Sequence, residues 1–233
     1  MEARAIVIKD NEVSENGFKI LKESSEKVKN DFEVKRFDAI TPDRVDELME
    51  EYQIKWNYPW EGEVVDFGTG LKKKSYPTGD PKKRIACALS HYMLWKESVD
   101  TGKTLLILEH DAVFQLKMDF DISQTLFKIV GINNPLMCTR KARLYYQLVK
   151  DNQVEVQAVP WIDSDRMIPQ GLAGNSAYII TPTAANDLIE KIHEPLVGMW
   201  PNDALMCRQL FHYLGVTRKF YTSVQGLPST TTL

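Results

Sequence analysis

The segment Thr104–Leu108, TLLIL, is the most strand-like run of the chain, and it stops abruptly at the polar triplet Glu109-His110-Asp111. Four consecutive apolar residues after Thr104 favour a strand that is buried on both faces, which is typical of an inner strand in an α/β sheet. The preceding residues 84–99 repeat apolar side chains at helical spacing and end before Gly102. The sequence therefore predicts a helix followed by a buried strand, with polar groups where the strand leaves the sheet.

The beginning of the chain alternates strands and helices. Residues 3–8 form a branched apolar run, and residues 32–37 alternate apolar and polar side chains as a strand does. Between them, residues 18–28 show near-helical spacing of apolar side chains among Lys and Glu. Residues 41–52 form an acidic segment with Thr41 placed to cap a helix. The order is thus strand, helix, strand, helix.

The rest of the chain adds weaker signals of the same kind. We expect helices near 122–129 and at 183–192 and 204–214, strands at 142–149, 154–159 and 174–180, a long loop over 53–83 and an irregular tail over 221–233. The strands at 142–149 and 154–159 are expected to form a hairpin at Asp151-Asn152. The resulting fold class is α/β, a mixed and mostly parallel sheet flanked by helices in a single domain, residues 1–233.

Composition excludes several classes of protein. Of the 233 residues, 43% are hydrophobic and 26% are charged, which suits a globular domain rather than a disordered or fibrous chain. A net charge of −3 provides no overall attraction to nucleic acid or membrane. The three cysteines show no metal-knuckle spacing, and neither a signal peptide nor a membrane span is evident, so we expect a cytoplasmic protein.

The triplet after the buried strand has the chemistry of a cation site. Side chains alternate along a strand, so Glu109 and Asp111 point to one side and His110 to the other if the chain stays extended. Two carboxylates at the carboxyl end of a strand suit Mg²⁺ or Mn²⁺, and His110 would favour Mn²⁺ if it joined. The alternative is an acidic pair that ends a strand at solvent.

The helix at 84–99 carries further polar candidates. His91 and Trp95 are four residues apart and share a face, where they could flank a base or sugar, although a structural role for His91 is the commoner outcome. Cys87 and Ser90 have no base at local spacing that would make either a nucleophile.

Taken together, these segments resemble glycosyltransferase family 25, which includes lipopolysaccharide, lipooligosaccharide and collagen galactosyltransferases. The family pattern is a Cys-x-Leu-Ser-His helix, a strand ending Glu-Asp-Asp, and a Gly-x-x-Ala-Tyr strand, in that order. The matching segments are FDAITP at 37–42, IACALSHYMLW at 85–95, LLILEHDAVF at 105–114, GNSAYIITPTAANDLIEKI at 174–192 and PNDALMCRQL at 201–210.

The resemblance implies a GT-A architecture, a nucleotide-sugar donor that is usually UDP-linked, and transfer with inversion at the anomeric carbon. The metal and diphosphate role of the family falls on Glu109 and Asp111, while His110 replaces a family aspartate. The second acidic site falls on Asp203, which is either the general base or a helix N-cap. Residues 1–115 would form the nucleotide-binding half and residues 116–233 the acceptor side.

Other donor contacts are expected from several segments. Family members usually carry arginines after the first strand, where this chain has Lys9, so Lys9 or Ser14 would replace them or simply lie in a solvated loop. On the helix at 84–99 the donor-binding candidates are Arg84, Ser90 and His91.

A basic stretch precedes that helix and bears on the acceptor. Lys72, Lys73 and Lys74 lead a group of six basic residues up to Arg84, opposed by one acid, and Trp60 stands close by with Trp56 and Tyr58. Such a patch could grip the donor diphosphate or a phosphate-bearing acceptor, or it could be a solvated loop. We expect a saccharide or lipopolysaccharide-type acceptor first, and hydroxymethylated DNA, with its base extruded against the aromatics, second.

Two rival functions remain open at this point. The histidine in the acidic triplet is consistent with a catalytically degenerate member of the family that only binds a glycan or nucleic acid. A metal-dependent phosphohydrolase could also use Glu109, Asp111 and Asp203, but the sequence lacks the histidine-rich ligand set that many such sites contain.

Overall fold

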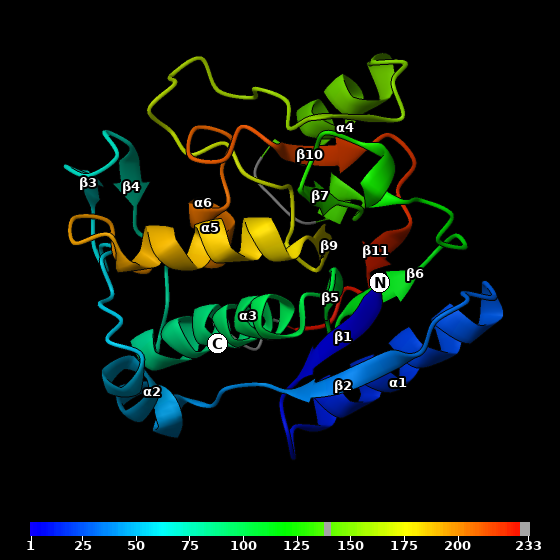
Figure 1. Ribbon diagram of the computed structural model, residues 1–233, viewed down its shortest axis with the longest axis horizontal. Coiled ribbons are helices and arrows are strands. Elements are labelled where there is room, and N and C mark those ends of the chain that lie inside the picture. Colours follow the sequence, from blue (N-terminus) through cyan, green and yellow to red (C-terminus); the bar gives the residue numbers. More distant parts are fainter. Residues whose placement is uncertain (138–140, 229–233) are drawn as a thin grey trace.

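The computed structural model describes residues 1–137 and 141–228 (Figure 1). Its central feature is a seven-stranded sheet in the order β2-β1-β5-β9-β7-β10-β8. Two additional two-stranded sheets pair β3 with β4 and β6 with β11. In chain order the elements are β1 (Glu2–Val7), α1 (Glu12–Lys27), β2 (Val34–Asp38), α2 (Val45–Glu51), β3 (Glu63–Val65), β4 (Lys72–Lys74), α3 (Pro81–Thr101), β5 (Leu105–Glu109), β6 (Ala112–Phe114), β7 (Ile129–Gly131), α4 (Ala142–Asp151), β8 (Val156–Ala158), β9 (Ala177–Ile180), α5 (Pro182–His193), α6 (Asn202–Leu205), β10 (Leu214–Thr217) and β11 (Thr222–Val224).

The sheet is mixed, and the direction of β9 decides where polar residues gather. Strands β2, β1 and β5 run parallel, whereas β9 runs antiparallel to both of its neighbours, β5 and β7. The carboxyl end of β5 therefore lies beside the amino end of β9. The backbone N–H of Glu109 donates to the carbonyl of Ser176 at 2.9 Å, which fixes that junction.

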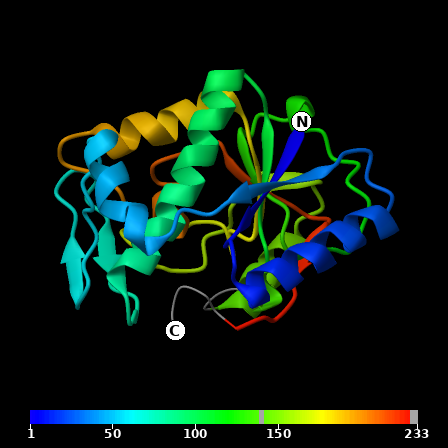
Figure 2. The ribbon, with the colours of Figure 1, turned by 90° about the horizontal axis from the view of Figure 1, so that it is seen from below.

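The sheet separates two hydrophobic cores, as the alternation of its buried strands requires. Leu105 and Ile107 of β5 pack with α2, α3 and α5, while Leu106 and Leu108 face the opposite side with α1. Figure 2 shows α1 on one side of the sheet and α3 with α5 on the other. The prediction of an α/β fold with a mixed sheet between helices is confirmed.

Helix α3 has clear physical boundaries. Asp80 caps its N-terminus by accepting a hydrogen bond from the Lys82 N–H, and Pro81 occupies the first turn, where its missing N–H costs nothing. Gly102 ends the helix in the left-handed conformation with φ 65°, which favours glycine. The helix extends beyond the predicted 84–99 at both ends, and the β1, α1, β2 and α2 predictions are likewise confirmed with shifted bounds.

The predicted hairpin of strands at 142–149 and 154–159 is wrong in its first half. Residues 142–151 form helix α4, in which the buried side chains, Tyr145 and Val149, are four residues apart. That spacing places both side chains on one helical face. The prediction failed because the same residues can also be interpreted as the alternating pattern of a strand. Only the second strand exists, as β8, and it pairs with β10 instead.

Two predicted helices are also wrong. Residues 122–124 form a single 3-10 turn that ends at Thr125, whose hydroxyl accepts a hydrogen bond from the N–H of Phe127, and the chain then enters β7. The helix expected at 204–214 is reduced to the single turn α6, because the backbone leaves helical geometry at Met206, where ψ is 71°. Strand β10 begins at Leu214, the last residue of that segment.

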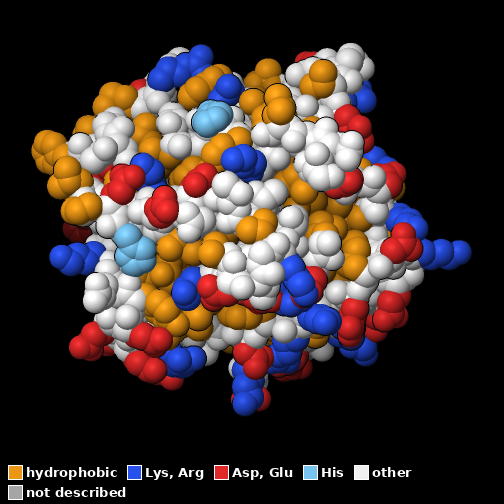
Figure 3. Space-filling view, viewed as in Figure 1, with side chains coloured by type: hydrophobic (Ala, Val, Ile, Leu, Met, Phe, Trp, Pro, Cys, Tyr) orange, Lys and Arg blue, Asp and Glu red, His pale blue; other side chains and the backbone are white. Residues whose placement is uncertain are grey.

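The predicted loop and tail contain short strands. Within 53–83 the chain forms the β3–β4 hairpin, and within the predicted tail it forms β11, while residues 229–233 lie outside the description. Exposed Val64, Val65 and Phe67 lie on or beside the hairpin, where Figure 3 shows hydrophobic side chains at the left edge of the molecule. Elsewhere on that face, acidic and basic side chains are interspersed. None of the described helices combines the length and apolarity needed to cross a bilayer.

Candidate active site

A pocket of about 460 Å³ opens at the edge of the sheet where β1 and β5 end and β9 begins. This is the edge at which open α/β sheets bind ligands. Its wall includes α3, the segment before β9 and the start of α6, together with Ile6 from the beginning of the chain and Val224 from near its end. The predicted site residues that line it are Arg84, Ser90, His91, Glu109, His110, Asp111 and Asp203.

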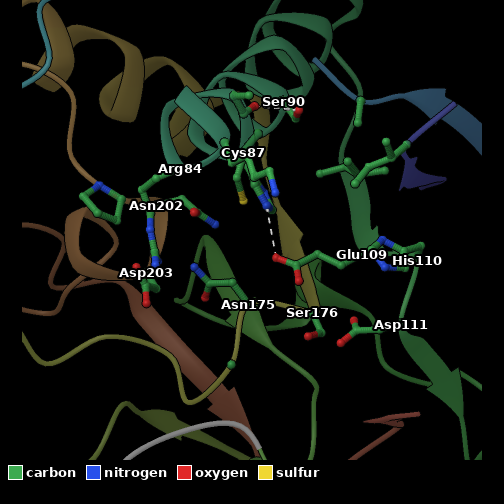
Figure 4. A pocket seen from close by; sticks show the side chains of 18 of the residues that line it. Arg84, Cys87, Ser90, Glu109, His110, Asp111, Asn175, Ser176, Asn202 and Asp203 are labelled. Atoms are coloured by element: carbon green, nitrogen blue, oxygen red, sulfur yellow. Dashed lines mark hydrogen bonds and ion pairs between the residues drawn. The ribbon is translucent and has the colours of Figure 1, made fainter. Parts of the chain in front are cut away.

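A chain of buried aromatic side chains leads to Glu109. The Trp95 indole donates to the Tyr178 hydroxyl at 2.9 Å, and Tyr178 bonds to Nδ1 of His91 at the same distance. His91 Nε2 then lies 3.4 Å from Oε1 of Glu109 (Figure 4). Burial, the largest single influence, opposes ionisation of Glu109, but the combined interactions with His91, His110 and Ser176 lower the pKa of the carboxyl.

His91 and Trp95 share one face of α3, as predicted from their spacing. Trp95, however, is not placed to contact a base or sugar. That indole is 1% exposed and its N–H is used by Tyr178. It belongs to the core and serves the site only through the hydrogen-bonded chain to His91. Only His91 reaches the pocket wall.

The surroundings of Asp111 disfavour the ionised form of its carboxyl group. Burial and the charge of Glu109 raise its pKa to about 7. Its Oδ1 is buried without a hydrogen-bond partner in the part of the chain that the structure describes. Figure 4 shows the Asp111 carboxylate beside Ser176, on the same side as Glu109. Two partly buried carboxylates of this kind, one of them with an unpartnered oxygen among the described residues, have the chemistry of a cation-binding position.

His110 lies apart from that pair. Its imidazole is displaced from the Asp111 carboxylate in Figure 4, and burial lowers its pKa. Among residues 1–137 and 141–228, the one group of three or more His, Cys, Asp or Glu side chains close enough to share an ion consists of Cys87, His91 and Glu109. The structure therefore does not bring His110 together with Glu109 and Asp111 as a three-residue ligand set.

Asp203 stands on the pocket wall at the start of α6, across from Asp111 (Figure 4). Solvent reaches its side chain, yet desolvation by the surrounding protein raises its pKa, and the nearby guanidinium of Arg84 opposes that rise. No side-chain capping bond is made at the start of α6, so the N-cap interpretation of Asp203 has no support. Its backbone position depends on Gly171, where a Cβ would lie 2.5 Å from the Asp203 carbonyl oxygen.

Ser90 links two segments of the pocket wall through hydrogen bonds of its hydroxyl group. Its hydroxyl donates to the carbonyl of Ala86 at 2.8 Å and accepts from the N–H of Ile40 at 2.9 Å. The first bond is internal to α3, and the second ties the segment after β2 to the helix. Ser90 thus shapes the pocket through Ile40, which also lines it.

The remaining predicted contacts lie outside the pocket. Lys9 is exposed in the turn after β1, and the Ser14 hydroxyl accepts a hydrogen bond from Ile8. Lys72 pairs with Asp165 at 2.6 Å. Lys73 is buried in an ion pair with Asp66, also at 2.6 Å. Exposed residues at this end of the molecule include Lys74 and Trp60, and Trp60 stacks on Trp56.

The sequence analysis missed Asn175. Its side chain is 6% exposed and lines the pocket, yet neither amide atom has a hydrogen-bond partner within the described ranges. An unpartnered buried amide offers both a donor and an acceptor to a ligand. The signal was present in the segment GNSAY, but only the antiparallel direction of β9 places its start at the pocket.

The structure defines the class of protein as an α/β fold whose pocket, at the end of β1 and β5, has carboxylates on two sides. The class is confirmed by comparison with known families, because residues 19–206 match glycosyltransferase family 25, described as LPS biosynthesis proteins. The match covers most of the chain, so the protein belongs to this family and is a glycosyltransferase. A search of curated proteins finds none that matches it.

Proposed function

We propose that this enzyme transfers a sugar from a UDP-linked donor to a hydroxyl of a saccharide or lipopolysaccharide-type glycan, with inversion, and that it depends on Mn²⁺ or Mg²⁺. The observation that carries the proposal is the pair of acidic walls in one pocket, with Glu109 and Asp111 on one side and Asp203 on the other. The description of the family as LPS biosynthesis proteins supports the glycan acceptor.

The residues present fit a hard divalent cation. Glu109 and Asp111 offer carboxylate oxygens, and none of residues 1–137 and 141–228 donates a hydrogen bond to Oδ1 of Asp111. When bound, the cation supplies positive charge that stabilises the departing nucleoside diphosphate. The imidazole of His91, whose ring is fixed on its other side by Tyr178, lies 3.4 Å from Glu109 and favours the ionised form of that carboxylate.

Asp203 is suited to accept the proton of the acceptor hydroxyl. Its raised pKa makes it a stronger base than an ordinary exposed aspartate, and Arg84 favours its ionised form. Because Asp203 lies across the pocket from Asp111, the hydroxyl attacks from the side opposite the leaving group. Attack from that side forms the new glycosidic bond as the bond to the diphosphate breaks, which gives inversion.

Asn175 is placed to position a substrate. Its amide makes no hydrogen bond within the described part of the chain, and it faces a cavity whose volume falls in the range of small-molecule sites. Polar groups of this kind fix the orientation of a ligand and exclude isomers that leave them unpaired. We therefore assign Asn175 to recognition of the donor or acceptor hydroxyls.

Mass spectrometry of products tests the proposed function. The enzyme would be incubated with a panel of sugar nucleotides, Mn²⁺ and candidate glycans, with hydroxymethylated DNA in a parallel arm. We expect a glycan product from a UDP-sugar that disappears with EDTA, and a loss of about 10²- to 10⁴-fold in rate for Asp203→Asn. The exposed Asp151→Asn serves as the matched control. Transfer that persists in EDTA, or a product only on DNA, would contradict the proposal.

A further inference from the structure

Cys87, His91 and Glu109 form a second ligand set beside the acidic pair. Cys87 and His91 lie one turn apart on α3, and Glu109 ends the strand that packs beneath this helix. Each contributes one ligand atom, and the three atoms lie within 4.8 Å of one another. All three side chains line the pocket, and Figure 4 shows the Cys87 sulfur facing the space between the helix and Glu109.

His91 provides independent evidence for a ligand. The residue is wholly buried, and its Nε2 makes no hydrogen bond to residues 1–137 or 141–228. The nearest charged atom, Oε1 of Glu109, is 3.4 Å away, which is long for a hydrogen bond. A buried ring nitrogen that faces a pocket without a close partner is an available metal ligand.

The surroundings of His91 suit metal binding. When Nε2 binds a cation, the ring proton resides on Nδ1 and is donated to the oxygen of Tyr178, 2.9 Å away. That oxygen has two lone pairs, and the other accepts from Trp95. Histidine ligands in proteins are commonly oriented by such a partner on the second nitrogen. The Trp95-Tyr178 pair therefore supplies the outer support that the site requires.

The donor atoms select a different cation from the acidic pair. Thiolate and imidazole favour Zn²⁺ and its analogue Co²⁺, whereas Mg²⁺ prefers oxygen ligands alone. We propose that Cys87, His91 and Glu109 bind one Zn²⁺, with the fourth coordination position open to the pocket. The Cys87 thiol releases its proton to solvent as the sulfur–metal bond forms.

This site would compete with the proposed hard-cation site, because both use Glu109. A carboxylate drawn toward Cys87 and His91 is less available to an ion shared with Asp111. Zn²⁺ should therefore inhibit transfer that Mn²⁺ supports. This consequence rests on the proposed function, whereas Zn²⁺ binding itself does not.

Cobalt provides the direct test, because Co²⁺ bound to a thiolate gives a charge-transfer absorption that oxygen ligands do not produce. The metal-free full chain would be titrated with CoCl₂ in the absence of nucleotide. We expect a band that saturates at one Co²⁺ per chain and is displaced by Zn²⁺. Absence of the band in the folded wild-type protein overturns the inference.

Variants assign the band to its ligand. Cys87→Ser should remove it, while Cys207→Ser, a buried thiol outside the pocket, should retain it. Cys138, which lies outside the described residues, gives a second control as Cys138→Ser. Tyr178→Phe should weaken Co²⁺ binding about 10- to 100-fold through loss of the outer hydrogen bond. A band that survives Cys87→Ser, in protein shown to be folded by circular dichroism, refutes the assignment.

The two proposals can fail separately. A cobalt band without sugar transfer would support the zinc site and contradict the proposed reaction. Transfer with Mn²⁺ in a protein that gives no cobalt band would support the reaction and overturn the zinc site.

Discussion

Replacing Asp111 by Asn should stabilise the metal-free protein, and the gain should depend on pH. Burial and the charge of Glu109 raise the pKa of Asp111 to about 7 in the folded protein, compared with 3.8 for an ordinary aspartate. The folded state therefore holds a proton that the unfolded state has lost between these two values, so the wild-type protein loses stability as pH rises from 4 to 7. Asparagine has no charge to bury and is free of this penalty.

The size of the effect follows from the two pKa values. Each tenfold difference in proton affinity corresponds to about 1.4 kcal/mol, so the shift costs the wild-type protein about 4 kcal/mol above pH 7 and less than about 1 kcal/mol at pH 4. The stability difference between Asp111→Asn and wild type should thus be about 3 kcal/mol more favourable at pH 8 than at pH 4. The same substitution should abolish transfer, because it removes a proposed cation ligand.

Urea unfolding with EDTA present would measure both stabilities at pH 8 and pH 4. Asp151→Asn, an exposed substitution, controls for the loss of one negative charge and should change stability by less than about 0.5 kcal/mol at either pH. A gain for Asp111→Asn that is equal at the two pH values, or a loss of stability at pH 8, would refute the electrostatic reasoning. Unchanged transfer by the variant would refute the role of Asp111 as a ligand.

Two further predictions concern the scaffold of the site. Gly171→Ala should lower the transfer rate about 100-fold, because the new Cβ would lie 2.5 Å from the Asp203 carbonyl oxygen and displace that backbone; a wild-type rate in kinetic assays would contradict this. Lys73→Met should cost about 3 kcal/mol in urea unfolding, since it leaves Asp66 buried without its cation. Lys72→Met, which breaks a more exposed ion pair, should cost less than about 1 kcal/mol, and equal losses for the two lysines would show that burial is not the cause.

The parts of the fold that the sequence predicted well are those with strong local signals. The TLLIL strand and the helix before it have continuous apolar burial, a capping aspartate and a terminal glycine, and each was located within a few residues. The segment 142–151 shows the opposite case, because a helix that buries only two of its side chains can resemble an alternating strand. Only the tertiary context, which buries Tyr145 and Val149 together, decides between them.

The site was predicted in part for a similar reason. Glu109 and Asp111 follow a strand end directly, so their proximity can be read from spacing alone. The meeting of Cys87 with Glu109 depends on how α3 packs over β5, and the position of Asn175 depends on the antiparallel direction of β9. Neither relationship is encoded in local periodicity. The lysine run shows a related limit, since the burial of Lys73 against Asp66 depends on the β3–β4 hairpin.

Binding of UDP with and without Mn²⁺ tests the central claim most directly. In isothermal titration calorimetry, Mn²⁺ should strengthen UDP binding to the wild-type protein by at least about tenfold, as expected for linked binding of ion and nucleotide. In Asp111→Asn that enhancement should be lost while the protein remains folded. Equal UDP affinity with and without Mn²⁺ in the wild-type protein, or an enhancement that survives in the variant, would contradict the account.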